Sequence, residues 1–227
     1  RDTDGNLILQ TGLPVTVNDE FISTDDIHYI ITGVKGNQAV AHRKLPDEIG
    51  LGTSNKSQPA ATLYYPNSLI LRTSGKKLAI YHTHNDEAYI PTDGKAEVRG
   101  NGSIMKVGAT LAQQLNSLGY QTIHSTTLHE PHDANAYHRS RRTAVQLLQK
   151  KPAALFDIHR DSAPLSAYQT TINGQNVTKI LLVVGRQNQN RMTTLNYVKK
   201  IKAAVDSKYK GLIRGIFIAH GNYNQDL

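Results

Sequence analysis

The chain has 227 residues, of which 38% are hydrophobic and 19% are charged, and this composition excludes a wholly disordered chain. It carries 26 Lys and Arg against 18 Asp and Glu, a formal net charge of +8, and it contains no Cys. The lack of Cys excludes disulfides, thiolate nucleophiles and Cys-type zinc sites, while the positive charge favours an anionic partner such as nucleic acid, anionic lipid or cell-wall polymer.

The first 45 residues are predicted to form a small antiparallel β module. Short runs rich in β-branched residues alternate there with turn-forming residues, and Lys35-Gly36-Asn37 between two such runs is typical of a hairpin. The expected strands cover residues 11–17, 20–23, 27–34 and 38–42. Residues 46–62 contain Gly, Pro, Ser and Thr without an apolar period, and the domain boundary is expected there or up to Gly75, so residues 46–75 are interpreted as a linker.

Residues 76–227 show strand-like runs that alternate with helical ones, and they are predicted to form a second domain. The expected strands cover residues 78–82, 120–124, 153–159, 179–184 and 212–219, and the expected helices cover residues 104–118, 140–150 and 192–205. This order predicts an α/β fold with a mostly parallel sheet and helices on both faces. No apolar run approaches the roughly 18 residues of a membrane-spanning helix.

Histidines lie at the ends of several expected strands, where open α/β sheets place their sites. His84 and Glu87 have the spacing His-x-x-Glu, and His159 follows a second strand. Two His and one carboxylate form a common catalytic zinc set that leaves a position for water. His82 would support this set or replace one of its ligands.

Other polar residues have a simpler interpretation beside the functional one. His220 is expected in an ordinary loop. His129, His132 and Asp133 could in principle bind a metal, but a solvated loop that ends in an Asp cap is the favoured interpretation. Arg141 is near the start of an expected helix, where a cation opposes the helix dipole. It therefore either binds an anion or a site carboxylate, or it lies on solvated surface.

Nucleic acid is not the expected partner. Aromatic residues make up 6% of the chain, and they do not interleave with basic residues in the manner that stacks bases. The sequence also lacks a Gly-x-Ser-x-Gly elbow, a P-loop and a Gly-x-Gly-x-x-Gly fingerprint. Gly100-Asn101-Gly102 is interpreted as a turn.

Several motifs resemble those of the stage II sporulation protein P family, in the same order along the chain. Residues 82–89 read His-Thr-His-Asn-Asp-Glu-Ala-Tyr, which is close to that family's His-Thr-His-x-x-Glu-x-Tyr signature. Residues 156–161 resemble its Asp-x-His-Arg-Asp box. Similar matches cover its glycine loop and first helix, its Tyr-x-x-Ser-Arg-x-Thr stretch, its Asn-Gln-Asp segment and its β-rich lead-in, at residues 100–108, 136–143, 223–227 and 18–23.

The resemblance implies a zinc-dependent peptidoglycan hydrolase with a fold like that of zinc N-acetylmuramoyl-L-alanine amidases. It implies cleavage of the amide bond between muramic acid and L-alanine, and of peptide cross-links, during engulfment in sporulation. The expected partners are peptidoglycan, a lytic transglycosylase and a membrane protein. The expected location is outside the cytoplasm, with this chain as the soluble ectodomain and a membrane anchor that lies outside it.

Carried over by position, the metal set is drawn from His82, His84, Glu87 and His159, with Zn²⁺ as the cofactor. Arg160 and Asp161 would support catalysis, and Arg141 would bind substrate. The related amidases carry a catalytic Glu on a last strand near the C-terminus. That general base is expected beyond Leu227, so the catalytic domain is predicted to lack its last strand. Glu97 and Glu130 are conceivable substitutes, although no spacing argument supports either.

Two other functions fit the same residues. The first is a zinc carboxypeptidase-like peptidase that acts on wall peptides, because such enzymes share His-x-x-Glu with a distant His. Arg141 or Arg160 would then clamp the terminal carboxylate of the peptide. The second is a non-catalytic module that binds the wall.

Overall fold

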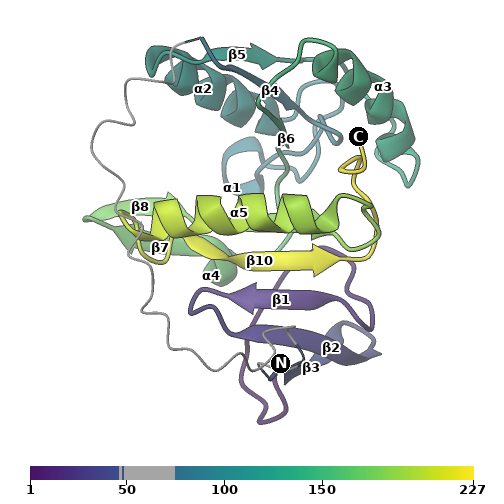
Figure 1. Ribbon diagram of the computed structural model, residues 1–227, viewed down its shortest axis with the longest axis vertical. Helices are drawn as coiled ribbons and strands as arrows, with labels where there is room; N and C mark the ends of the chain where they lie inside the picture. Colours follow the sequence, from purple (N-terminus) through teal and green to yellow (C-terminus); the bar gives the residue numbers. More distant parts are fainter. Residues whose placement is uncertain (46–47, 49–74) are drawn as a thin grey trace, which may run out of the picture. The chain divides into compact units, whose positions relative to one another are not determined.

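The structure is a computed structural model that describes residues 1–45, residue 48 and residues 75–227 (Figure 1). The predicted linker over residues 46–75 therefore lies almost wholly outside the described residues. Contacts within the chain divide the described residues into two compact units. We call residues 1–45, 48 and 161–226 the terminal unit, and residues 75–160 the central unit.

The sheet of the terminal unit joins both ends of the chain. Its strand order is β3-β2-β1-β10-β9, in which β9 and β10 are parallel and the other neighbours are antiparallel. The strands are β1 (Glu20–Ser23), β2 (His28–Lys35), β3 (Gln38–Arg43), β9 (Ile180–Gly185) and β10 (Ile213–Ala219). The predicted hairpin is confirmed, since Lys35 pairs with Gln38 and Gly36 has a positive φ of 58°. The N-terminal strands do not form a sheet of their own, because β1 pairs with β10.

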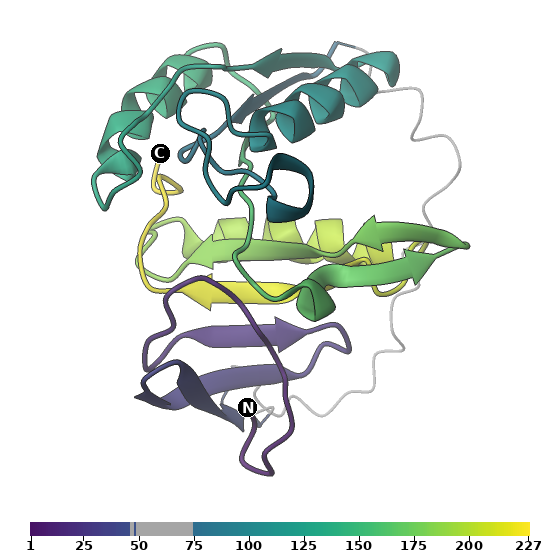
Figure 2. The same ribbon diagram turned by 180° about the vertical axis from the view of Figure 1, so that it is seen from behind.

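Different elements cover the two faces of this sheet. Helix α5 (Arg191–Asp206) lies across β9 and β10 in Figure 1, and its Leu195 and Val198 pack against Ile216 and Ile218. On the other face the segment before β1 runs across the sheet (Figure 2), and apolar residues from positions 8–15 pack around Phe217. The predicted strand over residues 11–17 is wrong, since that segment packs on the sheet without pairing as a strand. It contains a proline, which lacks the N–H that a strand ladder needs.

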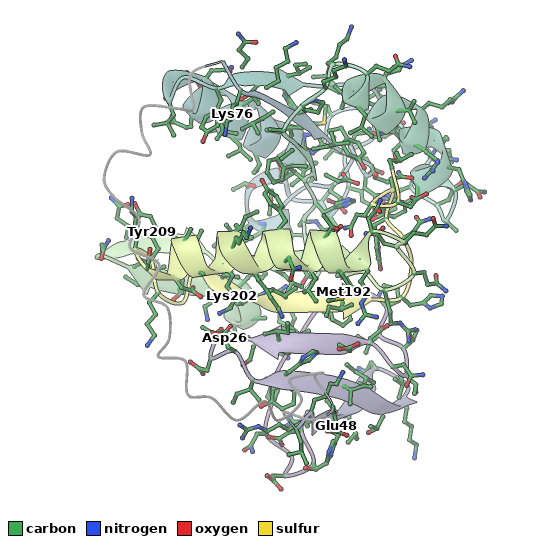
Figure 3. All side chains as sticks on the ribbon, in the orientation of Figure 1. Asp26, Glu48, Lys76, Met192, Lys202 and Tyr209 are labelled. Carbon is green, nitrogen blue, oxygen red and sulfur yellow. The ribbon has the colours of Figure 1, made fainter. Side chains whose placement is uncertain are left out.

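Smaller elements complete the terminal unit. Strands β7 (Gln169–Ile172) and β8 (Gln175–Thr178) form an antiparallel hairpin, preceded by the short helix α4 (Leu165–Tyr168). No element was predicted there, although the Asn173-Gly174 turn is a hairpin signal. Lys202 of α5 is buried and donates hydrogen bonds to Asp26 and Asp206 at 2.9 Å each, so α5 is tied to the turn after β1 (Figure 3).

The central unit contains a parallel sheet with the strand order β5-β4-β6. Its strands are β4 (Lys77–Tyr81), β5 (Gln121–His124) and β6 (Ala154–Asp157). Helix α3 (Ala136–Leu148) packs on the face that carries Ala79 and Tyr81. Helix α2 (Ile104–Ser117) packs on the opposite face, where its Gly108 lies against His82 and His124. A short helix, α1 (Ile90–Asp93), precedes α2.

The mixed α/β class is confirmed, but the single mostly parallel sheet is not. Within the described residues, β4, β5 and β6 form one sheet, whereas β9 and β10 belong to another. In the described part of the chain, helices cover both faces of the sheet of β4, β5 and β6, through α2 and α3. Apolar runs identify strands but not their partners, and the pairing of β10 with β1 was therefore outside the reach of the pattern. None of the helices that the structure describes combines the length and apolarity needed to span a membrane.

Candidate metal centre

The loops that leave β4 and β6 bring three of the predicted ligands together in the central unit. These strands are parallel neighbours, so their carboxyl ends lie at one edge of the sheet. The ring centroids of His84 and His159 are 5.4 Å apart, and the ring planes are inclined by 66°. Glu87 lies beside them, with its Oε1 3.4 Å from His159 Nδ1 and its Oε2 accepting the backbone N–H of Arg160 at 2.5 Å.

The spacing and inclination of the His84 and His159 rings fit a shared zinc ion, whereas the ligand atoms of His84, Glu87 and His159 are not drawn together within 4.8 Å of one another in the described part of the chain. A zinc–nitrogen distance of about 2.0–2.1 Å puts the centroids of two imidazoles on one tetrahedral ion roughly 5 Å apart, with inclined planes. The His84 Nδ1 atom is buried and has no hydrogen-bond partner among the described residues. Burial, together with the charges of His159 and His132, lowers the pKa of His84 to about 4. The His84 ring is therefore neutral at pH 7. Burial would lower the pKa of His159, but the carboxylates of Asp157 and Glu87 outweigh burial and raise it well above its ordinary value, so the His159 ring must lose a proton when it binds a metal.

Asp157 at the end of β6 orients His159. Its Oδ2 lies 3.1 Å from His159 Nε2, and it also accepts the hydroxyl of Thr83 at 2.5 Å. Its Oδ1 accepts the Thr83 N–H at 2.8 Å. Burial alone would raise the pKa of Asp157, but the charge of His159 and these hydrogen bonds outweigh burial and lower it. A His that binds a metal through one nitrogen usually donates its other N–H to such a carboxylate, which leaves His159 Nδ1 on the side of Glu87.

His82 lies away from this group and supports the fold. Its Nδ1 is 2.9 Å from the Ile158 carbonyl, and its Nε2 is 2.9 Å from His124 Nε2. A carbonyl only accepts, so His82 Nδ1 donates and His82 Nε2 accepts from His124. Burial lowers the pKa of His82 to about 4. Both of its nitrogens are engaged, and this geometry favours His84 over His82 as the ligand.

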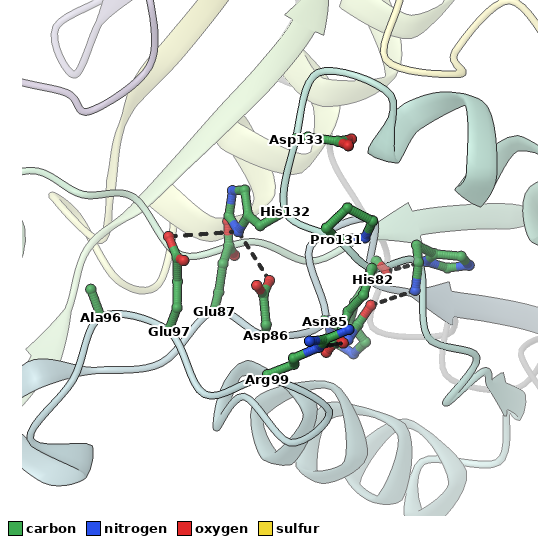
Figure 4. Close-up of polar contacts among 12 residues, drawn as sticks. His82, Asn85, Asp86, Glu87, Ala96, Glu97, Arg99, Pro131, His132 and Asp133 are labelled. Atoms are coloured by element: carbon green, nitrogen blue, oxygen red, sulfur yellow. Dashed lines mark hydrogen bonds and ion pairs between the residues drawn. The ribbon is translucent and has the colours of Figure 1, made fainter.

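His132 lies on the other side of His84. The two rings stack with centroids 3.9 Å apart and planes inclined by only 13°. Figure 4 shows His132 between Asp86 and Glu97, whose oxygens are 3.0 Å and 3.7 Å from its Nδ1. By distance alone, within the described part of the chain, His84, Asp86 and His132 form a group whose ligand atoms all lie within 4.8 Å of one another. Nearly parallel ring planes meet only far from both rings, so these two imidazoles cannot share an ion without rotating.

The prediction of a solvated loop is confirmed for residues 131–133, which are exposed and lie outside helices and strands, but it is wrong for His129. His129 is only 3% exposed, its N–H donates to Asn85 at 2.6 Å, and its Nδ1 lies 2.7 Å from the His82 carbonyl. Arg139 of α3 donates to the carbonyls of His129 and Pro131. The sequence signals this packing only through its density of His, Asp and Arg, because the contact between residues 82 and 129 is tertiary.

The remaining candidates are found in other surroundings. Asp161 belongs to the terminal unit, where its carboxylate accepts hydrogen bonds from Thr11, Gly12 and Arg214. The Arg160 side chain donates to the Ala96 carbonyl at 3.4 Å. The supporting roles expected of Arg160 and Asp161 stay predictions.

Arg141 is half-buried in the second turn of α3. That helix begins at Ala136, four residues before its expected start, so the dipole argument for an anion at Arg141 is lost because the effect fades after the first turn. Glu130 is held by Arg99 and the Gly100 N–H, which is a structural use of this carboxylate. The general base expected beyond Leu227 stays a prediction.

The fold and the site therefore define a mixed α/β protein in which two histidines and a carboxylate gather at the carboxyl edge of a parallel sheet. Comparison with known proteins is consistent with the motifs. The family model described as "Stage II sporulation protein P (SpoIIP)" matches residues 32–227, and the chain belongs to this family. A stage II sporulation protein P of Bacillus subtilis (strain 168) is 30% identical, over 68% of this chain and 44% of that protein. The chain thus spans less than half the length of this relative. No solved structure gives a significant match.

Proposed function

We propose that this chain acts in sporulation as a zinc-dependent cell-wall hydrolase. Its substrates would be the N-acetylmuramoyl-L-alanine amide bond and the peptide cross-links of peptidoglycan during engulfment. The observation that supports this most is that the His84 and His159 rings lie with their centroids 5.4 Å apart and that Glu87 lies beside His159. The family membership adds the sporulation context.

His84, Glu87 and His159 would hold the zinc ion. When bound there, zinc would polarise the scissile carbonyl and lower the pKa of its water toward about 7. The chain's own residues fix the ligands for this task. Asp157 forms an ion pair with His159 at Nε2, and the Arg160 N–H donates to one oxygen of Glu87. Thr83 holds Asp157 through its N–H and its hydroxyl, so the second strand end is fixed to the first.

We further propose that the chain works outside the cytoplasm, where peptidoglycan lies. In the whole protein it would be membrane-anchored and would act with a lytic transglycosylase and a membrane protein. The net charge of +8 would draw in anionic wall strands. Binding to isolated peptidoglycan should therefore weaken as the salt concentration rises.

Digestion of purified peptidoglycan tests the activity. The zinc-loaded chain is expected to release peptides from muramic acid, and His84→Ala should abolish this release. His220→Ala is the matched control, because it removes an imidazole from the terminal unit. Equal cleavage by the wild type and His84→Ala would contradict the catalytic proposal.

The same digest separates the alternatives. Release of single terminal residues without free muramic acid lactyl groups would show a carboxypeptidase-like peptidase. Retained binding to peptidoglycan without stoichiometric zinc or cleavage would show a wall-binding module.

A further inference from the structure

The amino end of the central sheet carries a concentration of lysines. A hollow of about 530 Å³ is lined there by Lys76, Lys77, Lys150, Lys151 and Gln149, with only glycine and alanine beside them. Lys76 and Lys77 lie at the start of β4 (Figure 3 labels Lys76), and Lys150 and Lys151 follow the end of α3. All four lysines are exposed, and none forms an ion pair with a residue that the structure describes.

The acidic residues of the central unit lie elsewhere. Residues 98–129 and 134–156 contain no Asp or Glu. The carboxylates of residues 75–160 are confined to residues 86–97, 130–133 and 157, which follow the carboxyl ends of the strands or lie in the loops there. The carboxylates of the central unit thus lie together with basic residues, whereas the four lysines at positions 76, 77, 150 and 151 lie apart from every carboxylate of the unit.

The frame of the hollow is fixed by backbone hydrogen bonds. The Ala153 N–H donates to the Lys77 carbonyl at 2.8 Å, and the Gln121 N–H donates to the Lys76 carbonyl at 2.9 Å. The Lys151 N–H donates to the Leu148 carbonyl at 2.8 Å. Four like charges are thus held on a rigid frame, where a bound anion would relieve their mutual repulsion.

We propose that this hollow, which we call the lysine hollow, binds a phosphate-bearing anionic polymer. Ammonium groups recognise phosphate as point charges, and four of them around one concavity suit successive anionic groups along a chain. A membrane surface fits less well, because the lining offers no large apolar side chain to enter the interface. The site would hold a wall-linked phosphodiester polymer without taking part in hydrolysis, and it does not depend on zinc.

Short-chain inorganic polyphosphate is the probe for this proposal. Its binding to the whole chain can be followed by calorimetry at low salt, for the wild type and for two double variants. K150Q/K151Q removes two charges from the lysine hollow, and K199Q/K200Q removes two exposed charges from α5. Both variants change the net charge equally, and circular dichroism melts verify that both are folded.

The proposal predicts that K150Q/K151Q weakens polyphosphate binding roughly tenfold, since two direct phosphate contacts are lost, and that K199Q/K200Q changes it less than about twofold, since only the distant field changes. K76Q/K77Q should reproduce the larger loss. Equal weakening by the hollow and α5 variants would overturn the proposal, because the attraction would then be general. Binding to vesicles of anionic phospholipid without binding to polyphosphate would also overturn it.

Discussion

Asp157 is the residue on which the orientation of His159 depends. Its carboxylate lies 3.1 Å from Nε2 as an ion pair, so Asp157→Asn removes the negative charge beside the ring while keeping the volume of the side chain. We expect zinc affinity to fall by about 10- to 100-fold, the usual effect of losing such a partner. Competition with a chelating dye measures it.

Two controls separate this effect from a loss of folding. Asp93→Asn changes a half-buried carboxylate of the same unit that contacts Tyr89, Thr92 and Ser103 instead of the candidate ligands, and it should leave zinc affinity unchanged. Thr83→Val removes a hydroxyl from Asp157 but leaves the contact with His159, so it should cost much less affinity than Asp157→Asn. Wild-type affinity in Asp157→Asn would show that Asp157 does not position the ligand.

His82 and His84 are two positions apart in sequence but have different surroundings. His82→Ala leaves the Ile158 carbonyl and His124 without their partner, and it opens a cavity under α2. We expect a loss of about 2–4 kcal/mol in the free energy of unfolding, measured in urea, with zinc binding retained at low temperature. His84→Ala should instead lose zinc and keep most of its stability. The reverse pattern would mean that the ligand had been misassigned.

Much of this residue-level arrangement could be predicted, and the reason is topological. His84, Glu87 and His159 follow strand ends, and the ends of parallel neighbours meet. Asp157 is the last residue of β6 and lies beside His159. His132 stacks on His84 from a loop whose carbonyls accept hydrogen bonds from Arg139. Nothing in the local spacing indicates either approach, so both required the structure.

At the scale of elements, the close packing of α2 on the central sheet depends on Gly108. A Cβ on Gly108 would lie 2.3 Å from His82 Nε2 and 2.7 Å from His124 Nε2. Glycine to alanine normally stabilises a helix interior by about 1 kcal/mol, but here overpacking should cost about 1–3 kcal/mol. Gly108→Ala should therefore unfold at a lower urea concentration. Ala109→Gly, on the exposed side of α2, should cost about 1 kcal/mol through helix propensity alone. Stabilisation by Gly108→Ala would contradict this packing.

A buried carboxylate links four elements of the terminal unit. Glu20 of β1 accepts from His28 of β2 at 2.6 Å, from Lys44 after β3 at 3.2 Å and from Arg191 of α5 at 2.7 Å. Burial alone would raise the pKa of Glu20, but the hydrogen bond from His28 and the charges of Lys44 and Arg191 lower it to about 2.

Stability should therefore depend on pH in a defined window. The pKa of Glu20 is lower in the folded chain than in the unfolded one, so its contribution is present above the unfolded value of 4.5 and is lost as pH falls toward 2. We expect about 1–3 kcal/mol of unfolding free energy to disappear over that range. In Glu20→Gln this part of the pH dependence should be absent, as urea titrations between pH 2 and 6 would show. An unchanged pH profile in Glu20→Gln would contradict the assignment.

The elements themselves were mostly predictable. Apolar period identified the strands of both sheets and the three long helices, because each buries one stripe or one face. Residues 11–17 have the same alternation, but they pack against the face of the sheet and do not pair as a strand. Composition alone does not distinguish these two arrangements. The start of α3 was missed because residues 136–139 lack an apolar stripe of their own.

For the whole molecule, the sequence pattern predicted the α/β class but not the division of the strands between two sheets. Strand β1 pairs with β10, whose partner residues lie 192 to 198 positions away, and no local signal encodes a pairing at that separation. The distribution of charge, by contrast, could be read from the sequence once the strands were placed. The acid-free segments of the central unit become a lysine-rich edge only when β4, β6 and α3 bring their ends together.

The account depends most on one zinc ion held by His84, Glu87 and His159. The direct measurement is the zinc content of the dialysed chain by atomic emission, for the wild type and for His84→Ala, Glu87→Gln, His159→Ala and His132→Ala. We predict one zinc per chain in the wild type and in His132→Ala, and a large loss in the other three. Zinc retained by His159→Ala but lost from His132→Ala would place the ion with Asp86 instead, and would contradict the assignment made from the orientation of the rings.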